Sequence, residues 1–361
     1  MRPFFVVGTR PEIIKMAPII HEFERKSIDP YLLHTGQHYS KSLSSQFFKD
    51  MSLKNPDKNL NIGSGTHSEQ TAKALVGIEK ALVKENPDIV LVQGDTNAVL
   101  SAALAAVKVG VPVGHVEAGL RSYDTRMPEE HNRRLTDHIS SYLFAPTEKS
   151  ATILKGEKVW GKIFVTGNTV IDALEDRVAL IKGRKSMASD FGLNKFALLT
   201  MHRAENVDDK IILTGLVDGL LSLDIDIVFS AHPRTISRLK EFDLLSNIEH
   251  EKKMHIIEPP GYLEFLALMR DCQFILTDSG GIQEEATAPS INKRVFVLRT
   301  STERPEAEES GHATLVGVDP SKFPEVITDA IQGGLEKSRK CPYGDGQASK
   351  KIVEILMKSL K

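Results

Sequence analysis

The sequence predicts an α/β protein with two Rossmann-like, doubly wound domains that face a central cleft. Three observations predict this fold class. Short apolar runs alternate with longer helical stretches, the alternation restarts after Asn168, and polar or glycine residues collect just after the apolar runs. Alternating strands and helices indicate parallel sheets with helices on both faces, and two such series indicate two domains.

The first series of apolar runs has the length of buried parallel strands. Its members are "PFFVVG", "PYLLHTG", "DIVLVQGD", "VPVGHVE", "YLFAPT" and "IFVTGN". Helices are expected between these runs, over Pro11–Arg25, Ser68–Glu85, Asn97–Val109 and Glu129–Ile139. The second series comprises "FALLTMH", "DIVFSAHP", "MHIIEPP", "FILTDSGG", "RVFVLR" and "ATLVGV".

The domain boundary is expected in or near Asn168–Arg184, a helix followed by the polar stretch "KGRKSMASDFG". We therefore assign residues 1–170 to an N-terminal domain and residues 171–345 to a C-terminal domain. The segment 346–361 contains "ASKKIVEILMKSL", an amphipathic helix that can pack back on the N-terminal domain. A chain of 361 residues fits two domains of ordinary size.

Composition narrows the function. The chain is 41% hydrophobic and 26% charged with a net charge of -2, so it has neither a basic field for nucleic acid nor an acidic tail. Its two cysteines form no disulfide framework and fit a reduced cytoplasm. The N-terminus lacks a signal-peptide pattern, and no apolar segment approaches the roughly 20 residues that span a bilayer.

Polar and glycine residues recur just after the predicted strands, which is the edge where doubly wound sheets bind ligands. Short turns explain glycines and Asp-Ser pairs there, but they explain repeated His and Arg poorly. After the first series the residues are Gly8, Thr9, Arg10, Thr35, Gly36, Gln37, Gly94, Asp95, Thr96, His115 and Glu117. After the second series they are His202, Arg203, His232, Asp278, Ser279, Gly280, Gly281 and Arg299.

The stretch "TDSGGIQEEA" indicates an anion site. Ser279, Gly280 and Gly281 join a strand to a helix, and side-chain-free backbone at a helix start favours phosphate. Ordinary turn and cap chemistry is the alternative. Glu285 lies one turn further on and suits a ribose or sugar hydroxyl better than phosphate.

Three cationic residues can assist such a site. In "GTRPEIIK", Arg10 ends a strand and Lys15 lies about a turn into the helix, as a phosphate pair or as surface cations. In "TSTERPE", Arg304 follows a strand as a possible phosphate clamp.

The chain lacks the motifs of several nucleotide-binding and metal-binding sites. There is no G-x-G-x-x-G for a dinucleotide cofactor and no G-x-x-x-x-G-K-[ST] P-loop. No H-E-x-x-H and no cysteine cluster supports zinc, and no G-x-S-x-G supports a serine nucleophile. The sequence therefore predicts neither a metal nor a redox cofactor.

Carboxylates remain the candidate acid–base groups. Each has a structural alternative. Asp95 can cap the helix that begins near Asn97, Glu117 can pair with Arg121, and first-turn acids such as Glu129 favour the helix dipole. Their shared position at one sheet edge favours a site.

Nine motifs in order resemble the non-hydrolysing UDP-N-acetylglucosamine 2-epimerases. They are "GTRPEIIKMAP", "TGQH", "QGDT", "HVEAGLRS", "MPEEHNRR", "VTGNTVIDAL", "HRAEN", "TDSGGIQEEA" and "TERPE". The resemblance runs from about Pro3 to about Gly317. It implies a GT-B-like fold, a homodimer, a UDP-sugar substrate, no cofactor and a role in polysaccharide biosynthesis.

The resemblance also implies a reaction. Anti elimination of UDP gives 2-acetamidoglucal, and syn re-addition with protonation on the other face inverts C2. By motif, Asp95, Glu117, Glu129 and His202 match the catalytic residues. Asp95 and Glu129 are expected to transfer the proton, Glu117 to orient or polarise, and His202 to stabilise the leaving diphosphate.

The remaining site residues follow by the same motif matches. Arg10, Ser279, Gly280, Gly281 and Arg304 resemble diphosphate contacts, and Lys15 and Glu285 resemble ribose or nucleotide contacts. The segment "EPPGYLEF", with Pro260 and Phe265, is expected to hold uracil.

Two segments depart from the family pattern. "EEATAPSINKRVFVLR" is about two residues longer than usual, which bears on the placement of Glu285. "YSKSLSSQFF" lacks the "REMLDQ" pattern with which many bacterial relatives bind a second, activating UDP-GlcNAc.

Four other functions stay open. They are a hydrolysing 2-epimerase that releases ManNAc and UDP, a 2-epimerase of another UDP-N-acetyl sugar such as a 2,3-diacetamido uronic acid, a GT-B glycosyltransferase, and a catalytically silent nucleotide-sugar binder. All four catalytic positions carry side chains that can perform the chemistry, which disfavours the catalytically silent binder.

Overall fold

The computed structural model describes residues 1–36, 48–334 and 339–360. It divides into two compact units: unit 1 comprises Met1–Ala173 with Gly344–Lys361, and unit 2 comprises Leu174–Tyr343. Most of the "YSKSLSSQFF" segment lies outside the described residues. In the part that the structure describes, no helix is both long and apolar enough to cross a membrane.

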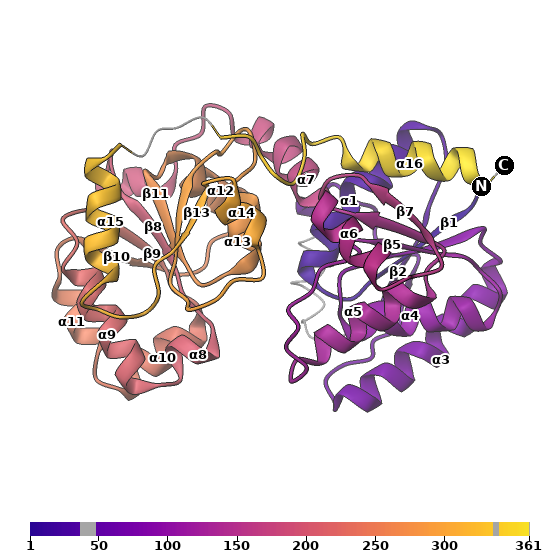
Figure 1. The fold of residues 1–361 in the computed structure, drawn as a ribbon, viewed down its shortest axis with the longest axis horizontal. Coiled ribbons are helices and arrows are strands. Elements are labelled where there is room, and N and C mark those ends of the chain that lie inside the picture. The colour runs from indigo at the N-terminus through magenta and orange to yellow at the C-terminus, as the bar shows by residue number, and fades with distance from the viewer. Residues whose placement is uncertain (37–47, 335–338, 361) are drawn as a thin grey trace. The chain divides into compact units, whose positions relative to one another are not determined.

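Unit 1 is built on a seven-stranded parallel sheet with the order β3-β2-β1-β4-β5-β6-β7 (Figure 1). β1 and β4 are buried along their whole length, as their unbroken apolar runs require. The strands are β1 (Pro3–Val7), β2 (Tyr31–His34), β3 (Lys58–Asn59), β4 (Ile89–Gln93), β5 (Val113–Val116), β6 (Tyr142–Ala145) and β7 (Lys162–Val165).

The helices of unit 1 begin at residues that favour helix starts. Thr66 and Glu69 form a capping box before α3, Thr96 caps α4, and Pro128 opens α5. The helices are α1 (Arg10–Arg25), α3 (His67–Glu85), α4 (Asn97–Lys108), α5 (Pro128–Ile139), α6 (Glu148–Gly156) and α16 (Ala348–Ser359), with α7 (Thr169–Val178) running into unit 2.

The C-terminal helix α16 packs against α1 in unit 1. Its first turn is held by the buried carboxylate of Asp172, which accepts hydrogen bonds from the Ser349 amide at 2.8 Å and the Ala348 amide at 3.2 Å. A helix start leaves amide groups without partners, so this side chain fixes where the returning chain begins its helix.

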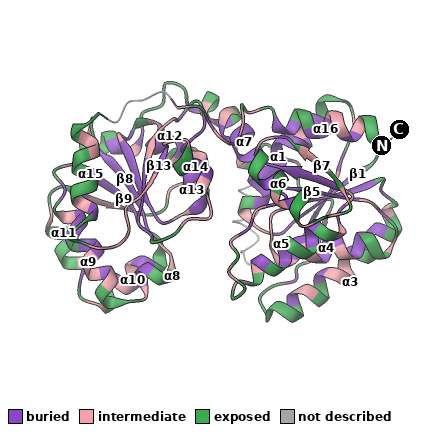
Figure 2. Cartoon of the chain, viewed as in Figure 1, coloured by how far each residue is buried: buried purple, intermediate pink, exposed green. Residues whose placement is uncertain are grey.

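Unit 2 is built on a six-stranded parallel sheet with the order β10-β9-β8-β11-β12-β13. Figure 2 shows buried residues along both sheets. The strands are β8 (Ala197–Thr200), β9 (Ile227–Ser230), β10 (Met254–Ile257), β11 (Phe274–Thr277), β12 (Arg294–Val297) and β13 (Ala313–Leu315). The predicted fold class of two parallel sheets with helices is confirmed.

Short helices follow most strands of unit 2. They are α8 (Ala204–Val207), α9 (Lys210–Leu221), α10 (Pro233–Glu241), α11 (Leu245–His250), α12 (Tyr262–Asp271), α13 (Gly280–Glu285), α14 (Pro305–Glu309) and α15 (Phe323–Gln332), with 3₁₀ turns η1 (Ala179–Ile181) and η2 (Met187–Phe191). The core between the sheet and the helices on one of its faces includes Phe229, Phe274 and Phe323.

Candidate active site

Each sheet reverses its strand order once, between β1 and β4 in unit 1 and between β8 and β11 in unit 2. Such a reversal leaves a crevice at the carboxyl ends of the strands, where open α/β sheets bind ligands. Asp95 follows β4, His202 follows β8, and Ser279 follows β11. Asp95, His202 and Ser279 therefore lie at the reversal points of their own sheets.

Glu117, just past β5, lies in a buried cluster of polar side chains. Lys15 Nζ is 2.7 Å and 2.8 Å from its two carboxylate oxygens. Gln93 Nε2 also donates to this carboxylate, and Asn168 Nδ2 donates at 3.3 Å. Buried charges are stable when they are paired and hydrogen-bonded, so the cluster holds Glu117 in one orientation.

This arrangement excludes the pairing with Arg121 and leaves the functional interpretation of Glu117 a prediction. Arg121 pairs with Asp137 and Glu157, not with Glu117, so the structural alternative from sequence was wrong. The contact between Lys15 and Glu117 was not expected. Binding of nucleotide by Lys15 stays a prediction.

The backbone of Glu117 is strained. Its φ is 71°, and it is the one buried residue among the non-glycine residues with positive φ in the described chain. Non-glycine residues in this region cost of order 1–3 kcal/mol and cluster at active sites. A strained backbone at a buried carboxylate is consistent with the predicted functional role of Glu117, which stays a prediction.

Asp95 is held from α5. Arg133 Nε lies 3.1 Å from Asp95 Oδ2, and Nη2 of the same guanidinium donates to that oxygen. Asn132 Nδ2 donates to the Asp95 carbonyl at 2.9 Å. The helix cap of α4 is Thr96, which accepts from the Val99 amide, so the alternative that Asp95 is a cap was wrong.

A third carboxylate, Glu12, bridges the reversal point of unit 1. It accepts from the Gly8 amide at 2.6 Å and from the hydroxyls of Thr9 and Thr96, both at 2.9 Å. Burial raises the pKa of Glu12 to about 7, and the nearby charge of Asp95 adds to the rise while the hydrogen bonds oppose it. Glu12 joins the loop after β1 to the loop after β4.

Glu129 and Glu130 open α5, but they differ. Glu130 is buried and accepts from the Ser122 amide at 2.9 Å and from Arg133 Nη1 at 2.9 Å. Glu129 is half-buried, and its carboxylate has no hydrogen-bond or ion-pair partner among the described residues. Glu130 is therefore a structural partner, while Glu129 is available to a ligand.

In unit 2 a fully buried carboxylate organises the loop after β8. Asp278 accepts from the amides of His202, at 3.0 Å, and Arg203, at 2.9 Å, and from Asn206 Nδ2 at 3.1 Å. His202 Nδ1 lies 3.5 Å from the same carboxyl group. Burial lowers the pKa of His202, and nearby cations, led by Arg203, lower it further while Asp278 opposes them. The neutral ring is thereby favoured.

The two glycines at the start of α13 have no structural explanation within the described chain. Neither has positive φ. A Cβ on Gly280 would come no closer than 3.7 Å to its neighbours, and one on Gly281 no closer than 3.9 Å. Packing therefore leaves room for side chains at both positions, and close approach of a ligand to the backbone stays the predicted reason for glycine.

Arg304 lies at the start of α14 and is anchored from α13. Its Nε is 2.5 Å from Glu284 Oε1, and Glu284 is fully buried. Glu285, the predicted ribose ligand, is the half-buried last residue of α13. Arg10, the first residue of α1, is also half-buried.

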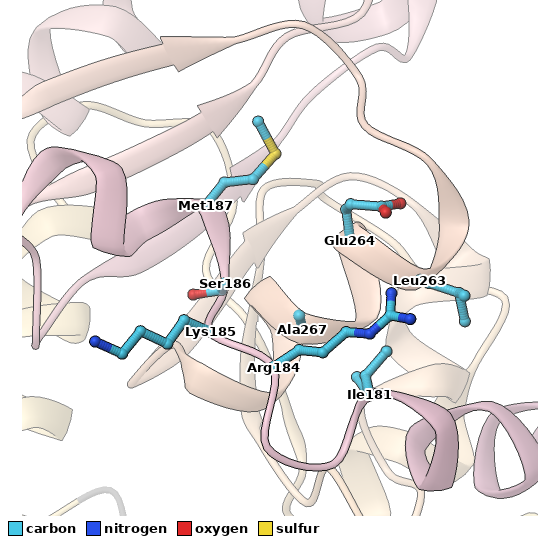
Figure 3. A pocket seen from close by; sticks show the side chains of 8 residues that line it. All are labelled: Ile181, Arg184, Lys185, Ser186, Met187, Leu263, Glu264 and Ala267. Carbon is cyan, nitrogen blue, oxygen red and sulfur yellow. The ribbon is translucent and has the colours of Figure 1, made fainter.

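The segment predicted to hold uracil spans the start of α12. Pro260 precedes its cap residue Gly261, and Phe265 donates its amide to the Gly261 carbonyl at 2.9 Å. A cavity of about 120 Å³ lies beside this helix (Figure 3). Its lining includes Leu263 of α12 and Arg184, but neither Pro260 nor Phe265, so the cavity does not bear on the uracil prediction.

Some contacts of the site were missed from sequence. Arg133 and Glu284 were not selected, although each anchors a predicted residue. Asp278 was noted as a residue that follows a strand, but its anchoring of the His202 loop was not predicted. Asp278 directly ends a buried strand, which is a usable signal for an anchoring carboxylate. In the described residues no group of three or more His, Cys, Asp or Glu side chains is arranged to hold a metal ion.

The two parallel sheets with helices define the class of α/β two-domain proteins of GT-B-like fold. Within that class, the model of the family described as UDP-N-acetylglucosamine 2-epimerase matches residues 21–357. The chain belongs to this family.

Individual relatives match this chain over almost their whole length. A UDP-N-acetylglucosamine 2-epimerase of Methanocaldococcus jannaschii is 49% identical over 99% of each chain. The crystal structure of the UDP-GlcNAc 2-epimerase of that organism, in complex with UDP-GlcNAc and UDP, matches with 48% identity and a TM-score of 0.87, over 99% of this chain and 100% of that one. A UDP-2,3-diacetamido-2,3-dideoxy-D-glucuronate 2-epimerase of Pseudomonas aeruginosa is 37% identical over 99% of this chain and 100% of the relative.

Proposed function

We propose that this protein is a non-hydrolysing UDP-N-acetylglucosamine 2-epimerase that interconverts UDP-GlcNAc and UDP-ManNAc. The observation that carries the proposal is the strained, buried Glu117 beside the strand end that bears Asp95, in a chain of this family. The M. jannaschii relative bound to UDP-GlcNAc and UDP supports the substrate class.

The proposed reaction needs no water and no redox step. A base removes the proton from C2 while the bond between C1 and the UDP oxygen breaks, and the C–H electron pair becomes the C1=C2 double bond. UDP and 2-acetamidoglucal then remain bound. C2 next accepts a proton on its opposite face, and the diphosphate oxygen re-forms its bond to C1.

In this reaction Asp95 and Glu129 transfer the proton at C2. Arg133 gives Asp95 a fixed position and a counter-charge, and Glu129 lacks a partner in the described chain that would compete with substrate. Glu117 is fixed by Lys15, which suits it to orient or polarise the sugar.

The diphosphate is the leaving group and then the nucleophile, so its negative charge must be stabilised in both steps. We assign this task to His202, Ser279, Gly280, Gly281, Arg304 and Arg10. A neutral His202 donates a hydrogen bond without adding charge, consistent with its lowered pKa. We assign ribose or nucleotide contacts to Lys15 and Glu285, and uracil to Pro260 and Phe265.

Incubation with UDP-GlcNAc in D2O, followed by NMR, tests the proposal. Deuterium at C2 of both UDP-sugars supports it. Free ManNAc with UDP indicates the hydrolysing enzyme, and transfer to an acceptor without C2 exchange indicates a glycosyltransferase. Absence of C2 exchange with this substrate contradicts the proposal.

Asp95→Asn tests the site. We expect C2 exchange to fall by about 1,000-fold while the fold is retained, because the base is lost and the Arg133 contact keeps an oxygen acceptor. Asp88→Asn is the matched control, since Asp88 lies at the opposite end of the same strand and accepts from the Arg2 amide. Exchange in Asp95→Asn equal to that of the control would make Asp95 a structural residue.

The P. aeruginosa relative favours one second candidate, a 2-epimerase of another UDP-N-acetyl sugar. The same D2O assay with a UDP-2,3-diacetamido uronic acid compares the two substrates by kcat/KM. Assembly as a homodimer is implied by the resemblance and stays a prediction.

A further inference from the structure

We propose that His115 and Asp137 form a buried positioning pair that fixes the loops carrying Asp95 and Glu117 against α5, the helix that carries Glu129. The inference rests on the proposed function and extends it to residues that contact no substrate. Both side chains are fully buried, with 0% exposure, so neither can reach a reacting atom.

His115, on β5, connects two oxygen acceptors. Its Nδ1 lies 2.7 Å from Asp137 Oδ1, and its Nε2 lies 2.8 Å from the carbonyl oxygen of Gly94. A carboxylate and a carbonyl both accept, so each contact is a hydrogen bond when the facing ring nitrogen carries a proton. The Gly94 carbonyl belongs to the peptide that leads into Asp95, which places the imidazole directly behind that residue.

Asp137, on α5, holds the neighbouring loop with its other oxygen. Oδ2 accepts from the Gly119 amide at 3.2 Å and lies 2.7 Å from Arg121 Nη1. Gly119 follows Glu117 by two residues. Its φ is 86°, and a Cβ there would lie 2.5 Å from the Ser150 carbonyl oxygen, so the backbone has little freedom to move.

One carboxylate therefore connects three catalytic segments. It reaches the Asp95 loop through His115, the Glu117 loop through Gly119, and Glu129 through α5 itself. Proton transfer is sensitive to displacements of about 1 Å, which cost about 100-fold in rate. Loss of the pair should lower kcat and leave KM almost unchanged.

Two substitutions of His115 each keep one of its two contacts and remove the other. In His115→Gln the amide nitrogen takes the place of Nε2 and keeps the Gly94 contact, whereas in His115→Asn it takes the place of Nδ1 and keeps the Asp137 contact. We expect kcat for C2 exchange to fall by about 10-fold in His115→Gln and about 100-fold in His115→Asn, with KM within about threefold of wild type.

His312→Gln is the matched control. His312 is also fully buried and bonded through both ring nitrogens, to Ser310 Oγ at 2.9 Å and Asn292 Oδ1 at 3.2 Å, but it lies at the amino end of β13 in unit 2. It should lower the melting temperature and leave kcat unchanged. A general loss from removing any buried histidine would instead lower kcat in all three variants.

Asp137→Asn tests the contact between Asp137 and the Gly119 amide. It also replaces His115→Asn as the test if that variant does not fold. The amide oxygen can still accept from His115, but the amide nitrogen faces the Gly119 amide. We expect kcat to fall by about 30-fold with KM unchanged. Equal kcat in His115→Gln and His115→Asn, or a loss carried by KM, would overturn the proposal.

Hydrogen exchange separates failure of this proposal from failure of the proposed function. We expect the peptides 92–97 and 114–122 to exchange faster in Asp137→Asn than in wild type or His312→Gln. Unchanged protection there contradicts the positioning role. If wild type shows no C2 exchange, the proposed function fails while this readout still decides the positioning.

Discussion

The carboxyl edges of the two sheets are built from different groups. In unit 1, charged side chains pair with charged side chains, as Glu117 does with Lys15 and Asp95 with Arg133. In unit 2, the buried Asp278 accepts from backbone amides, and the next turn carries Gly280 and its neighbour without side chains. The edge of unit 1 holds paired carboxylates, and the edge of unit 2 presents backbone together with the anchored cation Arg304.

This difference matches the two demands of the proposed reaction. Proton transfer at carbon needs carboxylates in fixed positions before substrate arrives, because reorganisation during the reaction would raise the barrier. Diphosphate binding needs backbone amide groups at a helix start and a cation held in position, as Arg304 is held by Glu284. The predictions below test whether chemistry and binding divide between the units in this way.

The largest effect is expected at Glu117. In Glu117→Gln we expect C2 exchange to fall by about 1,000-fold. The affinity for UDP, measured by calorimetry, should fall far less than the exchange rate, because only Arg10 and Lys15 of the assigned UDP contacts lie in unit 1. Loss of the carboxylate also breaks the buried ion pair with Lys15, so stability should fall by about 3 kcal/mol.

Glu22→Gln is the control for that variant. Glu22 is a buried carboxylate of the same unit that pairs with Arg25 near the end of α1, away from the strand ends. It should lose stability without losing exchange. If Glu117→Gln weakens UDP binding as much as it slows exchange, the division between chemistry and binding is wrong.

The next effect concerns Glu12 and pH. Burial raises the pKa of Glu12 from 4.5 to about 7, so the folded chain keeps this proton to higher pH than the unfolded chain. The stability that protonated Glu12 contributes is fully present below about pH 4.5 and is lost as the pH rises through 7. We expect the free energy of unfolding to fall by about 2 to 3 kcal/mol between pH 5 and 8 from this group.

Urea unfolding at each pH measures this effect. Fluorescence of Trp160, the single tryptophan of the chain, reports on unit 1. Glu12→Gln has no carboxyl to ionise and should flatten the slope, whereas Glu22→Gln should keep the wild-type slope. Parallel slopes in wild type and Glu12→Gln would show that Glu12 ionises without cost.

The fold was predictable because parallel strands buried on both faces leave continuous apolar runs in the sequence. The helix predicted over Asn97–Val109 is observed over Asn97–Lys108, and that over Pro11–Arg25 is observed over Arg10–Arg25. β3, with two residues, was missed, because so short a strand leaves no apolar run. A local apolar pattern predicts an element that is buried along its whole length, and it fails for a very short edge strand.

The geometry of the candidate site was predictable only in part. Asp95, Glu117 and His202 could be selected because each follows a predicted strand. Doubly wound sheets bind ligands at this edge, so the fold itself indicates where a site lies. Pairing was not predictable. Lys15 and Glu117 are separated by 102 residues, and neither local spacing nor residue type indicates that they meet. The nearest cation in sequence, Arg121, suggested the wrong partner.

The smallest effect is expected at Gly280. Gly280→Ala should leave stability within about 1 kcal/mol of wild type, because the new Cβ meets no described atom closer than 3.7 Å and φ is not positive. If the backbone contacts diphosphate, the methyl group should obstruct it. We expect UDP affinity to fall by about 10-fold, measured by calorimetry, because a displaced charge-assisted hydrogen bond costs about 1.5 kcal/mol or more.

Gly219→Ala gives the opposite pattern and serves as the control. Its Cβ would lie 2.3 Å from the ring of Phe323 in the core of unit 2, so stability should fall while UDP affinity holds. The pair separates a glycine required by packing from one required by a ligand. Unchanged UDP affinity in Gly280→Ala would mean that the open space beside this glycine is not used by the diphosphate, and the binding role of the unit 2 edge would then rest on His202 and Arg304.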